Sequence, residues 1–143
     1  MKVKFEFKKR KFVFYLSFTC FIGGSFVANS TVLEKYAWSN RLLIVVTERN
    51  ENSMEKQVRK FFNQNSCDFK ERNLKLLHFF SDDPTVLEMP SPFHSQTGMW
   101  LLGYDGTVKA QSKDVQLLNE LFEIIDTMPM RKREMKSTPR DCI

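Results

Sequence analysis

Arg41-Leu42-Leu43-Ile44-Val45-Val46-Thr47 is the stretch that decides the fold of this chain. The run is short, apolar and rich in β-branched residues, which indicates a strand buried on both faces of a sheet. Polar residues follow it, and Asn52 with Glu55 has the spacing of a capping box at the start of a helix. Apolar residues then recur with helical spacing at Met54, Val58, Phe61 and Phe62. The sequence therefore predicts a strand followed by an amphipathic helix that ends near Asn65.

A second apolar run, Leu74–Phe80, predicts another strand soon after that helix. Strand, helix and strand in this order favour a right-handed βαβ unit with parallel strands. Further along, the strand-like runs 99–103 and 107–110 flank Tyr104-Asp105-Gly106. Asp-Gly between two such runs indicates an antiparallel hairpin, because a tight turn needs a positive φ that glycine adopts without strain.

The last helix is predicted after Asp114, which can cap it. Its broad apolar face consists of Leu117, Leu118, Leu121, Phe122, Ile124 and Ile125. Pro129 ends or kinks this helix, and 130–136 can form a further short turn. The whole order, β-α-β, antiparallel hairpin and C-terminal helix, is that of a thioredoxin-like α/β fold. Ser81–Gly98 holds three prolines and little periodicity, so we expect a surface loop or an irregular connection there.

The first thirty residues have the zones of a secretion signal. Six basic side chains face one acidic side chain within 1–30, which accounts for the whole net charge of +5 and leaves the remainder formally neutral. An apolar run, Phe12–Phe21, follows the basic zone, and small residues suit cleavage after Ser30 or after Ala28. We expect a signal peptide over 1–30, a domain over 31–136 and a tail over 137–143. An uncleaved N-terminal anchor is the alternative.

Charge and hydropathy also bear on partners. A neutral domain gains little from counterion release on a phosphate backbone, so nucleic-acid binding is disfavoured. No second long apolar run follows the signal, so we expect no membrane contact after cleavage. The expected location is the periplasm or the extracellular space, with an envelope or extracellular protein as the partner.

Several longer stretches carry a family resemblance. They are Leu33–Leu43, which contains Trp38-Ser39-Asn40-Arg41, then Glu71-Arg72-Asn73-Leu74, then Leu102–Lys109, and finally Ile125–Met135 with its Met128-Pro129-Met130-Arg131. Together they resemble the DUDES family of thioredoxin-like domains, found in bacterial exported proteins and in animal matrix proteins such as equarin and the sushi-repeat-containing proteins. Tyr104 stands where that family tends to have a basic residue, and Thr107 where it tends to have a second glycine. The resemblance implies a thioredoxin-like fold and export, and it implies no settled activity.

Redox chemistry is the activity that such a fold would suggest. Thioredoxin-like oxidoreductases place a thiolate where the first strand meets the first helix, since the helix N-terminus lowers the pKa of the cysteine. The corresponding stretch here, Thr47–Met54, contains no cysteine. We therefore expect a redox-inactive domain with no catalytic residue. The alternative is a thiol oxidoreductase or peroxiredoxin-like antioxidant that uses Cys67, with Cys142 as its resolving partner.

Metal and cofactor chemistry find little support in the residues. His78 and His94 are accompanied by no carboxylate or cysteine at metal-ligand spacing, and methionines near a helix end are more often core residues than ligands for a soft metal. No phosphate loop, nucleophile elbow or dinucleotide fingerprint is present. We expect neither a metal nor a cofactor.

Two polar clusters remain as candidate binding residues. The first surrounds Trp38 and Arg41 at the entrance to the first strand, and the second follows the last helix at Asp126, Arg131, Arg133 and Glu134. In the structural interpretation, Arg41 pairs with a carboxylate such as Asp126, and Trp38 covers the edge of the core. In the functional interpretation, these residues form a partner-binding patch, because tryptophan and arginine are enriched at binding hot spots. The sequence leaves both open.

Overall fold

The computed structural model describes residues 31–50 and 52–137, so the predicted signal peptide and all but the first residue of the predicted tail lie outside it. The elements in chain order are α1 (Thr31–Glu34), β1 (Arg41–Thr47), α2 (Asn52–Gln64), α3 (Ser66–Glu71), β2 (Leu74–Phe80), α4 (Pro84–Leu87), β3 (Gly98–Leu102), β4 (Val108–Ser112), α5 (Leu117–Thr127) and α6 (Pro129–Ser137).

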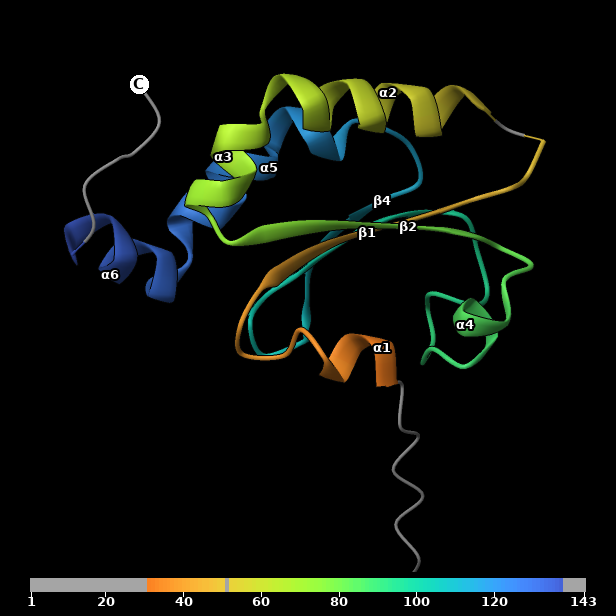
Figure 1. The fold of residues 1–143 in the computed structure, drawn as a ribbon, viewed down its shortest axis with the longest axis horizontal. Coiled ribbons are helices and arrows are strands. Elements are labelled where there is room, and N and C mark those ends of the chain that lie inside the picture. The colour runs from red at the N-terminus through yellow and green to blue at the C-terminus, as the bar shows by residue number, and fades with distance from the viewer. Residues whose placement is uncertain (1–30, 51, 138–143) are drawn as a thin grey trace, which may run out of the picture.

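The strands form one mixed sheet in the order β2-β1-β3-β4. β1 pairs with β2 in parallel and with β3 antiparallel, and β3 pairs with β4 antiparallel. Helices α2, α3 and α5 lie on one face of the sheet, and α1 and α4 lie on the other (Figure 1). The predicted mixed α/β class, the parallel pair and the hairpin are therefore confirmed.

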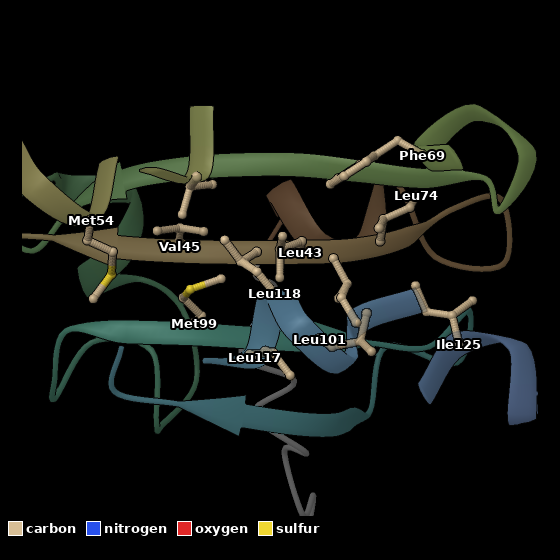
Figure 2. Close-up of a cluster of buried hydrophobic side chains, with 12 residues drawn as sticks. Leu43, Val45, Met54, Phe69, Leu74, Met99, Leu101, Leu117, Leu118 and Ile125 are labelled. Atoms are coloured by element: carbon tan, nitrogen blue, oxygen red, sulfur yellow. The ribbon is translucent and has the colours of Figure 1, made fainter. Parts of the chain in front are cut away.

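The central strand β1 is buried along its whole length because both faces of the sheet are covered. Its Leu43 and Val45 belong to the cluster beneath α2, α3 and α5, where side chains from these three helices meet side chains from β1, β2 and β3 (Figure 2). Leu42, Ile44 and Val46 belong to a second cluster on the opposite face. This two-sided burial is what the uninterrupted apolar run in the sequence predicted.

The turn between β3 and β4 also forms as predicted. Gly106 has a φ of +71°, and its N–H donates to the Gly103 carbonyl at 3.0 Å. The side chain of Asp105 accepts from the N–H of Thr107 at 3.1 Å. Glycine is favoured at position 106 because most side chains there would be strained in the left-handed region.

The expectation of an irregular connection over Ser81–Gly98 is confirmed outside the short α4, but the expected surface location was wrong. This segment contains α4, and it places Val86, Met89 and Phe93 in the second core cluster, each at most 3% exposed. The ring of Phe93 packs edge-on against Trp100, with 5.4 Å between centroids. The segment covers the second face of the sheet with isolated apolar residues, which leave no periodic pattern in the sequence.

Candidate functional site

Three segments that are far apart in the sequence meet around a surface hollow of about 360 Å³. They are the turn before β1, the β3–β4 hairpin and the junction between α5 and α6. We call it the Trp38 hollow, and its lining residues are Trp38, Arg41, Gly103, Tyr104, Asp105, Lys109, Met128, Pro129 and Met130. It therefore combines the first of the two predicted clusters with the Asp-Gly hairpin and the Met-Pro-Met motif.

Trp38 has an unusual conformation at this hollow. Its φ is +62°, in the left-handed region that bulky residues rarely adopt, and its side chain is 73% exposed. The backbone N–H of Trp38 donates to the Tyr104 carbonyl at 2.8 Å, which ties the turn to the hairpin. The left-handed conformation costs roughly 1–2 kcal/mol for a residue other than glycine. The expectation that Trp38 covers the core edge was wrong, because its ring lies largely in solvent.

Arg41 forms the floor of the Trp38 hollow and is only 1% exposed. Its guanidinium donates to the Arg72 carbonyl at 2.7 Å and lies 4.2 Å from the centre of the Tyr104 ring. Two further hydrogen bonds, at 3.1 and 3.2 Å, join it to both carboxylate oxygens of Glu134 on α6. The Arg41 charge is therefore already compensated, and its bonds fix the floor of the hollow rather than offering an open anion site.

Tyr104 completes this floor. Its hydroxyl accepts from Arg41 at 3.1 Å and from the Asn73 side-chain amide at 2.9 Å. Burial raises the pKa of Tyr104, so the phenol is neutral at physiological pH. Lys109 and Asp105 form an ion pair of 2.8 Å at the rim. The hollow thus carries little net charge, and the apolar part of its wall is made of Trp38, Met128, Pro129 and Met130.

The second predicted cluster is a buried ionic network. Asp126 accepts from Arg72 at 2.7 and 3.1 Å and from Arg131 at 3.0 Å. Arg131, which is 4% exposed, also donates to the Glu71 carbonyl at 2.8 Å. These bonds hold α5 and α6 against the α3–β2 junction.

Arg41 pairs with a carboxylate, as the structural interpretation of the sequence expected, but with a different one from the example given there. Arg41 pairs with Glu134 instead of Asp126, and Asp126 is occupied by Arg72 and Arg131. The Arg133 side chain is exposed and joins no ion pair with the described residues. Sequence reasoning missed Arg72 and Glu71 as network members, although both belong to the Glu-Arg-Asn motif that carried the family resemblance.

The network makes stability depend on pH. Burial alone would raise the pKa of Asp126, but the hydrogen bonds and charges of Arg72 and Arg131 outweigh it and hold that pKa below its usual value. A lowered folded-state pKa contributes stability above the unfolded value of about 4. We predict that this contribution is lost as the pH falls below about 4 through the folded pKa. The free energy of unfolding in urea, measured between pH 7 and pH 3, tests this prediction. The Asp126→Asn variant should be less stable than the wild type at pH 7, and its free energy of unfolding should fall less than that of the wild type on acidification.

The segment between β1 and α2, where a redox thiol was considered, contains no cysteine. At the carboxyl end of β1, the Thr47 hydroxyl and His78 Nε2 lie 2.8 Å apart, and burial lowers the pKa of His78. Cys67 lies in the first turn of α3, is exposed, and is disulfide-bonded. Cys142, its hypothetical resolving partner, lies outside the described residues. Over 31–50 and 52–137, no group of His, Cys, Asp and Glu side chains is arranged to hold a metal ion.

No helix in the described part of the chain is long and apolar enough to cross a bilayer.

Comparisons with known proteins place the domain in a family. Neither the curated proteins nor the solved structures contain a significant match. One family model, Domain of unknown function (DUF4174), matches residues 32–134, which include every residue of the Trp38 hollow and of the ionic network. The chain therefore belongs to the DUF4174 family.

Proposed function

We propose that this protein is an exported, redox-inactive thioredoxin-like domain that binds a protein partner at the Trp38 hollow. The observation that carries the proposal is the conformation of Trp38. The backbone strain opposes stability, and a ring that stays in solvent contributes little burial energy to offset it. A residue that costs stability and lies at the rim of a hollow fits a role in recognition.

The chemistry of the hollow supports a protein partner. Trp38 and Met130 are 73% and 43% exposed, and their neighbours in the lining are apolar or paired ions. Aromatic residues and methionine are enriched in the centres of protein interfaces. The buried bonds of Arg41 keep the floor rigid, which lowers the entropic cost of binding.

The thioredoxin-like assignment rests on topology and resemblance. The strand order β2-β1-β3-β4, with a parallel βαβ unit followed by an antiparallel hairpin and a helix, is consistent with a thioredoxin-like core. The same motifs that resemble the DUDES family contribute the Trp38 hollow and the ionic network. The basic and apolar zones of residues 1–30 support export to the periplasm or the extracellular space.

An enzymatic role through Cys67 is the competing proposal. It predicts turnover of a disulfide or peroxide substrate that disappears in Cys67→Ser. The absence of cysteine from Thr47–Met54 favours binding instead. Thiol-dependent turnover by the purified protein would contradict the binding proposal.

The binding role is tested by comparing two variants that each remove one exposed apolar side chain. Trp38→Gly removes the ring from the hollow, whereas Leu87→Ser removes a 64% exposed leucine from α4. After crosslinking in the producing cells, we expect a partner to be recovered with the wild type and with Leu87→Ser. Recovery with Trp38→Gly should fall by about 30-fold or more, the effect of losing a hot-spot residue. Equal recovery with all three proteins would contradict the role of the hollow.

A further inference from the structure

Among residues 31–50 and 52–137, the β2 strand forms an open edge of the sheet, separate from the Trp38 hollow. β2 pairs with β1 on one side and lies at the end of the strand order. Figure 1 shows β2 running along the side of the sheet nearest the viewer, with α2 and α3 above it. An edge strand presents unpaired main-chain groups that can pair with another strand.

The register determines which main-chain groups are open. Arg41 donates its N–H to the Asn73 carbonyl at 2.9 Å at one end of the pair, and Ser81 donates to the Thr47 carbonyl at 2.9 Å at the other. In a parallel ladder, alternate residues of a strand bond to the same neighbour. The residues that bond to β1 are therefore Lys75, Leu77 and Phe79. Those that direct N–H and C=O outward are Leu74, Leu76, His78 and Phe80.

The far end of this edge is closed. The N–H of Phe80 donates to the Asp83 carboxylate at 2.8 Å, and Arg49 stacks on the Phe80 ring at 4.6 Å while pairing with Asp83 at 2.9 Å. A charged side chain that caps the last outward N–H limits strand pairing to the stretch before it. The open stretch is therefore Leu74–His78.

Two hollows of about 260 and 290 Å³ lie between this edge and the helices above it. They share Phe62 and Leu76, so they adjoin one another along the strand. Their apolar lining is made of Val58, Phe62, Phe69, Leu74 and Leu76. Because side chains of a strand alternate between the faces of a sheet, an added strand would direct every second side chain toward these hollows.

The two ends of this groove differ in charge. At the start of β2, Lys70 and Lys75 line one hollow and are exposed, and no ion pair joins either to a described carboxylate. At the other end, Arg59 is already paired with Glu55 at 2.7 Å. The groove therefore favours an acidic group beside the start of β2 and uncharged residues along the rest.

We propose that the β2 edge binds an extended segment of a partner protein by strand addition. The segment pairs antiparallel with Leu74–His78, has apolar side chains at alternate positions, and carries an acidic group at its C-terminal end beside Lys70 and Lys75. An extended peptide fits this place better than a second copy of the domain. Edge-to-edge pairing of two copies would bring a second α2 to the space that α2 already borders.

The proposal is tested with the exported domain and the synthetic peptide Thr-Val-Thr-Val-Thr-Val-Glu. On addition of this peptide, the amides of Leu74, Leu76 and His78 should gain protection from hydrogen exchange. The amides of Lys75, Leu77 and Phe79 should be protected before and after addition. A peptide with proline at its central position should bind about tenfold more weakly or worse, since it loses a ladder hydrogen bond.

Charge reversal tests the predicted antiparallel orientation of the peptide, which places its acidic end beside Lys75. Lys75→Glu should weaken binding of the acidic peptide by about threefold or more at low salt. Lys60→Glu, a matched change on α2 that lines neither hollow, should leave the affinity unchanged. Peptide-induced protection that lacks the alternating pattern would overturn the proposal. So would no binding at millimolar peptide, or concentration-dependent protection of the same amides without peptide, which would indicate pairing of two copies. None of these outcomes depends on Trp38, so they are separable from the binding test above.

Discussion

Asp126→Ala should lower the free energy of unfolding by about 3 kcal/mol, because it leaves two buried arginines without their nearest carboxylate. Arg72 and Arg131 have side chains only 8% and 5% exposed, and Asp126 lies 2.7 and 3.0 Å from them. Arg72 keeps an ion pair with Asp68 at 2.8 Å, whereas the carboxylates that remain near Arg131 lie at 3.7 and 3.8 Å. The expected fall in melting temperature is roughly 10 °C or more.

The matched control is Asp82→Ala. Asp82 also pairs with an arginine, Arg49, at 2.7 Å, but both side chains are more than half exposed. Such a surface pair contributes less than about 1 kcal/mol. Chemical denaturation of both variants at pH 7 distinguishes the two environments. Equal stability of Asp126→Ala and Asp82→Ala would show that the network around Asp126 does not hold α5 and α6 in place.

The same comparison separates the two interpretations of the second polar cluster. If Asp126 and Arg131 bind a partner, replacing them should remove binding and leave stability intact. The structure instead gives both residues internal partners, so the expected loss is one of stability. The proposed recognition of a partner then rests on Trp38 and its neighbours in the hollow.

Phe93→Ala should lower the free energy of unfolding by about 3–4 kcal/mol, the usual cost of a cavity left by a buried aromatic ring. Phe93 is 3% exposed and packs against Trp100 in the second core cluster. In a surface loop, the same change would cost less than about 0.5 kcal/mol. Leu87→Ala, at a 64% exposed position in the same segment, should remain within that range. A Phe93→Ala variant as stable as Leu87→Ala would contradict the role of this segment as a core layer.

The regular elements could be predicted from the sequence because each has a repeating pattern. The strands Arg41–Thr47 and Leu74–Phe80 have the predicted bounds, and α2 ends one residue before the predicted end. Their side-chain periodicity reflects the geometry of the element itself. The layer over 81–98 could not be predicted, since Val86, Met89 and Phe93 are buried by contact with distant strands.

The candidate site was predictable in composition but not in geometry. Tryptophan and arginine beside the first strand marked Trp38 and Arg41 as candidates, and both line the hollow. Their environments are opposite, with the arginine buried and the tryptophan exposed. Only tertiary packing decides this, because Arg41 is buried through its bonds to Glu134 and Arg72, which lie far along the chain. The positive φ of Trp38 likewise has no signal in the sequence.

The most direct test of the account is the free energy of unfolding of Trp38→Gly, measured by chemical denaturation beside the wild type. Glycine relieves left-handed strain of roughly 1–2 kcal/mol, which stabilises the folded state. Its greater freedom in the unfolded chain opposes this gain by about 0.5–1 kcal/mol. The account predicts a variant at least as stable as the wild type, with the tryptophan retained for recognition. A loss of more than about 1 kcal/mol would show that Trp38 supports the fold, and would contradict its role as a binding residue.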